Sequence, residues 1–171
     1  MAKYFYDTDK KITQGGILKD PVIYSINTDL QPQEIKLQYA TIISQACDIQ
    51  QSELDNNYLP NIMVLPMYIL DVFKSGEHLQ NCGYQVKQRT FGTGEIPKLI
   101  KNSEFSRYHF LPKGEHLLHD VVIDFKHYYT LPKNLIINQY QGRYIATIDY
   151  LYRELLSQRF CNYLGRIGLP A

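Results

Sequence analysis

The sequence predicts a mainly β protein with an antiparallel, barrel-like sheet and one helix at its C-terminal end. Short runs of β-branched and aromatic residues are separated by glycine, proline and asparagine, which is typical of strands joined by turns. Strand patterns do not alternate with helical ones, so a parallel sheet of β-α-β units is not expected. The chain has 171 residues, of which 44% are hydrophobic and 20% charged, and this is enough for one domain with a core.

The strand predictions rest on short apolar runs bounded by turn residues. The run before Asp48 alternates at first and is fully apolar at its end, as expected of a strand that becomes buried on both faces. Residues 50–57 are polar and are expected to form a connection, and residues 135–137 a last short strand or a bend. The predicted strands cover residues 17–26 with a break at Pro21, 35–44, 62–65 ending at Pro66, 108–111 and 121–125.

Two stretches are predicted to lie outside the sheet. Residues 1–15 are polar and charged, and we expect a flexible N-terminal arm followed by a single domain of residues 16–171. Residues from about 72 to 105 contain Gly92, Gly94 and Pro97 and lack a clear period. Such a long insertion in a compact domain is either functional or mobile.

The end of the chain predicts an amphipathic helix. Thr147 or Asp149 can cap its start, and Gly165 with Pro170 can end it. Apolar residues recur at helical spacing, and we expect them to form one stripe that covers the sheet. The members of this predicted stripe are Ile148, Leu151, Tyr152, Leu155, Phe160, Tyr163 and Leu164.

Composition excludes some classes of protein. The three cysteines lack the spacing of a disulfide framework, which favours a reducing compartment. The sequence has no signal-peptide pattern and no apolar run near the ~20 residues that span a bilayer. We therefore expect a cytoplasmic protein without membrane association. The net charge of +1 conceals an uneven distribution, because residues 1–71 are net acidic whereas residues 72–107 and 126–171 are net basic.

The most informative segment is Tyr39 to Asp48. Its apolar run ends abruptly in Ser44, Gln45, Cys47 and Asp48, at the exit of a predicted buried strand. Cys47 could be a nucleophile beside an acid, because a thiolate needs a base or a positive field, which His109 or His127 would supply from neighbouring strands. In the structural alternative, Cys47 is a small buried residue and Asp48 bonds the turn backbone.

A second set of residues combines positive charge with aromatic rings. If they lie on one face, they can contact phosphates and stack on bases, whereas the alternative is a solvated sheet edge. The members of this set are Lys98, Lys101, Arg107, Tyr108, His109, Lys126, His127 and Tyr128. His78 and Cys82 are spaced for one helix face, but the paired ligands typical of zinc sites are missing, so neither a metal nor a cofactor is predicted.

The order of these pieces resembles the PemK/MazF-like, SH3-like barrel superfamily. A glycine-led strand at Gly16 is followed by a strand ending at Ser44, a strand ending at Pro66 and a terminal helix. The box Ser44-Gln-Ala-Cys-Asp48 and the tail Arg166-Ile-Gly-Leu-Pro170 are similar to a family of poorly characterised bacterial proteins with an SQxCD box and an RxGLP end.

This resemblance implies two functions of different classes. The first is a nucleic-acid-binding or RNase-like toxin or defence component that cleaves RNA without a metal. In it, Ser44, Gln45, Cys47 and Asp48 would line the pocket, Arg107 or His109 would contact phosphate, and a histidine would act as acid or base. The superfamily's arginine and Ser/Thr are replaced here by Lys36 and Gln38 and by Met67 and Tyr68.

The second function is a non-catalytic protein-interaction module of a bacterial multi-gene system such as phage defence. It would use the same groove for a cognate protein partner, and either function is compatible with an oligomer. The replacements at the superfamily's catalytic positions favour this second hypothesis.

Overall fold

The computed structural model describes residues 3–55, 58–82 and 92–166, with side chains left out at residues 80–82. Its main sheet is antiparallel throughout, with the strand order β1-β10-β2-β5-β6-β8-β7, and β9 also pairs with β6. The mainly β, antiparallel class predicted from the sequence is confirmed. The strands are β1 (Tyr4–Phe5), β2 (Gly16–Lys19), β5 (Tyr39–Ile42), β6 (Asn61–Ile69), β7 (Tyr108–Leu111), β8 (Val121–Asp124), β9 (Tyr129–Pro132) and β10 (Tyr144–Ile148).

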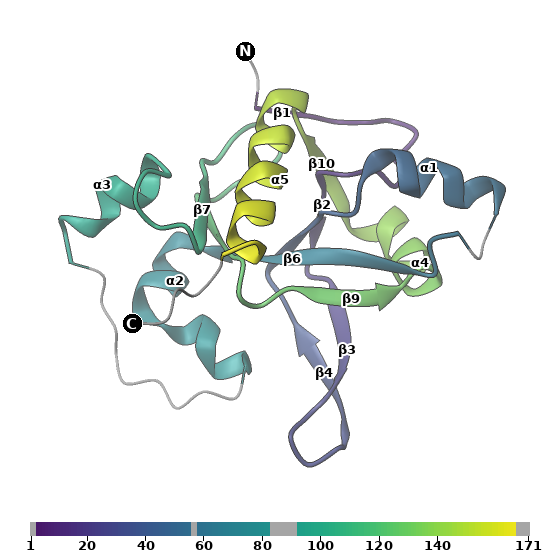
Figure 1. Cartoon of the computed structure of the whole chain (residues 1–171), viewed down its shortest axis with the longest axis horizontal. Helices are drawn as coiled ribbons and strands as arrows, with labels where there is room; N and C mark the ends of the chain where they lie inside the picture. The colour runs from purple at the N-terminus through teal and green to yellow at the C-terminus, as the bar shows by residue number, and fades with distance from the viewer. Residues whose placement is uncertain (1–2, 56–57, 83–91, 167–171) are drawn as a thin grey trace.

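Helices and a separate two-stranded ribbon surround this sheet (Figure 1). The ribbon is formed by β3 (Val22–Ile26) and β4 (Pro32–Lys36) and extends away from the rest of the molecule. The helices are α1 (Ala46–Leu54), α2 (Leu70–Ser75), a 3-10 helix (Glu77–Cys82), α3 (Glu95–Ile100), α4 (Lys133–Arg143) and α5 (Tyr150–Leu164). Of these, α2, the 3-10 helix and α3 lie between β6 and β7, in the predicted insertion.

The long strand β6 does not stop at Pro66, as the sequence suggested. One edge of β6 pairs with β9 up to Val64 and with β8 from Met67 onward, and Pro66 lies in the gap between them. On the other edge, the carbonyl of Met63 accepts a hydrogen bond from the N–H of Ile43. Backbone groups of alternate residues point to opposite edges, so those of the odd-numbered residues of β6 point toward β5. The backbone of Pro66 therefore points toward the gap between β9 and β8. A proline is tolerated there because no ladder bond is lost.

Several segments differ from their sequence predictions. The single strand predicted over residues 35–44 is divided between the end of β4 in the ribbon and β5 in the main sheet. Residues 46–54, most of them predicted to be a connection, form α1, in which only Ile49 and Ser52 are buried. Residues 135–137 lie inside α4, and residues 144–148 form β10. Two buried positions give α1 too sparse an apolar pattern to be recognised as an amphipathic helix.

The start of the chain is docked on the sheet. Tyr4 pairs with Ile148 of β10, and its hydroxyl donates a 2.6 Å hydrogen bond to the carbonyl of Pro112. The N–H of Asp149 donates a 2.8 Å bond to the carbonyl of Lys3. Part of the segment that the sequence predicted as a flexible arm therefore contributes an edge strand.

Helix α5 begins as predicted but faces the sheet differently. The Asp149 side chain accepts a 3.4 Å bond from the N–H of Leu151, so Asp149 is the N-cap. The side chains that pack inward are Leu156 and Phe160, whereas Leu151 is 59% exposed and Leu155 44% exposed. The predicted stripe is wrong for these two leucines and for Leu164, which is 49% exposed, because the helix turns Phe160 and Leu156, which lies outside the predicted stripe, toward the sheet.

The sheet has a core on each of its faces. Ile42 and Val64 belong to one hydrophobic cluster, and Tyr39 and Leu65 belong to the other. Side chains alternate between faces along a strand, so β5 and β6 supply both clusters. The cluster on the face of α5 includes Leu156 and Phe160, which places that helix as a cover.

We predict that Gly16→Ala destabilises the protein whereas Gly142→Ala does not. A Cβ at Gly16 would lie 2.4 Å from the Tyr140 hydroxyl and 3.1 Å from the carbonyl of Thr13, so β2 or α4 must shift. Overpacking of this kind costs about 1–3 kcal/mol. A Cβ at Gly142 has nothing within 4 Å, and alanine suits a helix better than glycine. Urea unfolding of both variants measures the difference, and equal stabilities would contradict the predicted close contact.

Candidate functional site

The predicted box of polar residues lies where the chain leaves the sheet and enters α1. The Ser44 hydroxyl accepts a 2.8 Å bond from the N–H of Met63, which ties the exit of β5 to the neighbouring strand. Gln45 precedes the helix, so Cys47 and Asp48 lie in its first turn. The sequence prediction that these residues sit at a strand exit agrees with this placement.

A cleft of about 680 Å³ separates this segment from α5. Its size is within the range of natural ligand pockets. The side chains of Ile43, Met63 and Phe160 are buried or half-buried and form an apolar floor. The lining residues are Gln14, Ile43, Ser44, Gln45, Ala46, Cys47, Asp48, Leu59, Met63, Tyr150, Arg153, Glu154, Ser157, Phe160, Cys161 and Leu164. All four residues of the predicted pocket therefore line one cavity.

The α5 wall of the cleft is held by side-chain hydrogen bonds. Arg153 Nη1 donates to the Gln14 carbonyl at 3.2 Å, and Gln14 Nε2 donates to the Ser157 hydroxyl at 2.9 Å. That hydroxyl donates to the Arg153 carbonyl at 3.0 Å. The guanidinium carbon of Arg153 also lies 5.2 Å from the centroid of the Tyr150 ring. These bonds tie the wall at Arg153 and Ser157 to the segment before β2.

Sequence reasoning did not identify this wall. It described a single apolar stripe on this helix and singled out none of Arg153, Glu154 and Ser157. The available signal was the spacing of Tyr150, Arg153, Ser157, Cys161 and Leu164, which recur every three or four residues and therefore share one helix face.

The thiol of Cys47 has polar neighbours but no imidazole. Its sulfur lies 3.5 Å from the amide oxygen of Gln45 and 3.8 Å from Oδ1 of Asp48. Both neighbours accept hydrogen bonds, so they bind the thiol form. Cys47 and Cys161 are free and exposed, and no histidine is among the described residues that line the cleft. The arrangement therefore suits binding better than nucleophilic attack, which needs an activating base.

His109 is buried in the sheet away from this cleft. It is 2% exposed on β7, with its ring centroid 6.3 Å from that of Phe125. Burial, and secondarily the charge of Arg159, lower the pKa of His109 to about 3. The imidazole is therefore neutral near pH 7 and does not line the cavity that holds Cys47.

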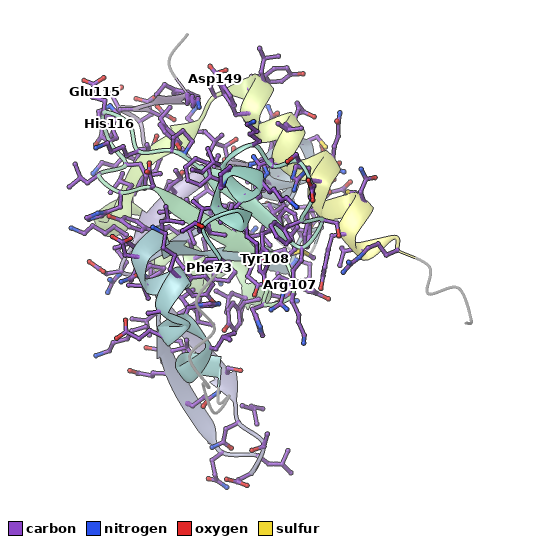
Figure 2. All side chains as sticks on the ribbon, turned by 90° about the vertical axis from the view of Figure 1, so that its left-hand side faces the viewer. Phe73, Arg107, Tyr108, Glu115, His116 and Asp149 are labelled. Carbon is purple, nitrogen blue, oxygen red and sulfur yellow. The ribbon has the colours of Figure 1, made fainter. Side chains whose placement is uncertain are left out.

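The structure brings Arg107, Tyr108 and His127 together around a buried carboxylate. Arg107 Nε and Nη2 donate to the two oxygens of Asp124 at 2.7 and 2.6 Å, and Asp124 is fully buried. This bond raises the pKa of Arg107 above its usual range. His127 Nε2 lies 3.7 Å from Asp124 Oδ2, but burial lowers the pKa of His127. Figure 2 shows Arg107 and Tyr108 next to Phe73, whose ring meets that of Tyr108 edge-on at 5.0 Å.

The other basic residues of the predicted set are dispersed. Lys98 forms a 2.7 Å ion pair with Glu104, and Lys101 is exposed at the end of α3. Arg159, which was not in that set, donates to the backbone carbonyls of Asn102, Phe105 and Tyr108 and so joins α5 to the segment before β7. Much of the local positive charge thus has a structural partner.

Neither a metal centre nor a membrane-spanning helix accompanies the cleft in the part of the chain that the structure describes. Among the described side chains, no group of three or more His, Cys, Asp or Glu residues is placed to hold a metal ion, and Cys82 lies outside those side chains. Within the same residues, every helix is too short or too polar to cross a bilayer. Residues 167–170 of the predicted tail motif lie outside the described residues. No protein-family model matches the chain, and no curated protein matches it in sequence.

We predict that His109 makes stability depend on pH. Its pKa in the folded protein is about 3, below the value of about 6.5 expected after unfolding, so the unfolded state binds the proton more readily. The free energy of unfolding should fall as the pH falls from about 6.5 towards 3. One such group contributes a slope of at most about 1.4 kcal/mol per pH unit.

The His109→Gln variant tests this by denaturant titration at several pH values. Its stability should depend less steeply on pH than that of the wild type, whereas the exposed control His119→Gln should follow the wild type. Buried His78, whose pKa is lowered to about 4, contributes equally to all three proteins. Identical slopes for the wild type and His109→Gln would contradict the assignment.

Proposed function

We propose that this chain is a non-catalytic protein-interaction module that binds a segment of a partner protein in the cleft between α1 and α5. The observation that carries the proposal is the composition of that cleft. The predicted box lines it together with an apolar floor, and none of its described lining residues is a histidine that could serve as acid or base.

The cleft has the anatomy of a recognition site. Its apolar floor of Ile43, Met63 and Phe160 can accept an apolar side chain of the partner, which is how most interfaces gain their affinity. Around the floor stand Gln45, Asp48 and Glu154, whose side chains can accept hydrogen bonds from the partner. The α5 wall is already fixed, so little ordering is needed on binding.

The proposal includes a relationship with the PemK/MazF-like, SH3-like barrels. It is supported by the antiparallel pairing of the glycine-led strand β2 with β5, and of β5 with β6, which are the pieces that carry the resemblance. From that resemblance we also take the setting, a bacterial multi-gene system of the phage-defence kind. In that setting the occupant of the cleft is a protein encoded with this chain.

We expect that filling the cleft abolishes partner binding. Cys161 lines the cleft and is exposed, so Cys161→Trp would occupy it without disturbing buried residues. Leu155→Trp is the matched control, because Leu155 lies on the same helix, is exposed and does not line the cleft.

The measurement is co-purification after co-expression with proteins encoded beside this chain. The wild type and Leu155→Trp should retain a stoichiometric partner that Cys161→Trp loses, with all three equally folded by circular dichroism. Retention of the same partner by Cys161→Trp would place the binding surface elsewhere, and the absence of any stoichiometric partner would remove the module hypothesis.

A second candidate function is RNA binding at the surface around β7 and β8. It is favoured by the partly exposed Arg107, whose guanidinium carbon lies 5.1 Å from the Tyr108 ring centroid, and by the exposed side chain of Lys126 nearby in sequence. Arginine and aromatic rings together suit phosphate contact and base stacking. The pairing of Arg107 with Asp124 offsets its charge, which is why we rank this function second.

Expression in bacteria separates the interaction module from an RNase. For the interaction module, we expect normal growth and intact bulk RNA with both the wild type and Asp48→Ala, because no cleavage chemistry is assembled in the cleft. Degraded RNA with the wild type and intact RNA with Asp48→Ala would instead support an RNase that uses the cleft. Degradation by both proteins would support cleavage without Asp48.

A further inference from the structure

The ribbon of β3 and β4 is an ordered projection. In Figures 1 and 2 it extends away from the rest of the protein. The side chain of Asn27 orders its tip, since its Oδ1 accepts bonds from the N–H groups of Asp29 and Gln31 at 3.0 and 2.9 Å. The N–H of Asn27 also donates to the Gln31 carbonyl at 2.9 Å. The two outer edges of this ribbon can therefore be compared in detail.

Alternate residues of β3 face away from β4. The carbonyl of Pro21 and the N–H of Asn27 both form hydrogen bonds across the ribbon. In an antiparallel pair, the backbone groups of successive residues point alternately toward the partner strand and away from it. The backbone groups of the odd-numbered residues of β3 therefore point toward β4. Val22 faces outward accordingly, and its N–H and carbonyl bond the Gln139 side-chain amide at 2.8 and 2.9 Å. Gln139 thus closes this edge at Val22. Tyr24 and Ile26 are the next outward-facing residues.

The edge of β3 is open at Tyr24 and Ile26. In the described part of the chain, β4 is the one strand that pairs with β3, and no helix or loop bonds the main chain at these two residues. Their side chains are 54% and 66% exposed, and residues 22–26 carry no charge. An uncharged edge with open N–H and carbonyl groups is a template for another strand.

The outer edge of β4, in contrast, disfavours pairing with a further strand. Its outward-facing residues are Pro32, Glu34 and Lys36, because Gln33 and Ile35 pair with the inward-facing residues of β3. Proline lacks an N–H, and charged side chains on an edge disfavour pairing with a further strand. The difference between the two edges singles out β3 as the docking edge.

We propose that β3 pairs with β3 of a second copy of this chain, in an antiparallel register centred on Ser25. In this register, Tyr24 lies opposite Ile26 of the second copy, and Ile26 lies opposite Tyr24 of the second copy. Every open N–H and carbonyl group of the two residues then gains a partner. Each tyrosine ring packs beside an isoleucine, a favourable cross-strand pair.

The arrangement suits a second copy because it is self-complementary. A two-fold axis through Ser25 makes the same patch serve both chains, and the contact closes without leaving a further open edge at these residues. Charges do not oppose it, because Glu34 and Lys36 lie on the β4 strands, which become the outer strands of the joined four-stranded sheet. The contact is small, so the dimer should be weak and concentration-dependent.

Cross-linking of the full chain tests the register. Ser25→Cys places a thiol on the proposed axis, where facing Cα atoms approach about 4.5–5.5 Å, within disulfide range. Under a mild thiol oxidant we expect a dimer linked through position 25, located by peptide mapping because the chain has natural cysteines. Gln33→Cys, at the paired position on β4, is the control and should remain largely unlinked. Equal cross-linking of the two variants would overturn the choice of edge.

Sedimentation velocity tests the dimer without cysteine chemistry. The wild type should show a dimer fraction that rises with concentration. Ile26→Pro should lose the dimer, because the substitution removes an outward-pointing N–H but none of the hydrogen bonds to β4. Ile26→Val should keep the dimer. Circular dichroism confirms that both variants fold. A wild type that remains monomeric up to several hundred micromolar, or an Ile26→Pro variant that dimerises as well as the wild type, overturns the proposal.

Discussion

The structure depends on the pairing of β6 along both of its edges. Asn61 to Val64 pair with β9 and Met67 to Ile69 with β8, while β5 occupies the other edge. The cleft is built from the same strand, because Met63 bonds both Ser44 and Ile43 and lines the cavity itself. Immediately before the strand, Pro60 accepts a 2.9 Å bond from the first residue of α4. Helices on both sides of the sheet are therefore positioned from one central element.

Arginine side chains join the irregular segments to this sheet. Arg107 holds the buried Asp124 at the end of β8, and Arg153 holds the segment before β2. Arg159 bonds two carbonyls before β7 and the carbonyl of its first residue. A buried carboxylate without such a partner would be costly, and carbonyls outside regular structure need donors. Part of the positive charge of the two net-basic segments, residues 72–107 and 126–171, therefore has a structural role.

The two proposed recognition features, the cleft and the β3 edge, lie in separate parts of the molecule. The cleft combines an apolar floor with acceptors and a fixed wall, whereas the ribbon offers main-chain groups and two exposed apolar side chains. A module that binds one partner in a cavity and a second copy along a strand could assemble two partners symmetrically. The free thiols Cys47 and Cys161 both face the cavity, so modification of either would affect the cleft and leave the ribbon unchanged.

Several strands, the position of the polar box and one helix cap were determined by the sequence itself. Alternating and β-branched runs identified β5, β6, β7 and β8, because a strand with two buried faces leaves a clear local pattern. The box at Ser44 to Asp48 was placed correctly at a strand exit for the same reason. Asp149 was one of two proposed caps of the last helix, since capping depends on neighbouring residues alone.

Tertiary structure decided the rest. Helix α5 carries two possible apolar faces, one with Leu151 and Leu155 and one with Leu156 and Phe160, and only the sheet selects between them. Strand β10 and helix α1 are weak local patterns that gain stability from their neighbours. Whether His109 could reach Cys47 depended on long-range pairing, which buried the histidine in β7 and left the thiol in a cleft. Local periodicity records which residues can be buried, but their partners are set by contacts between distant parts of the chain.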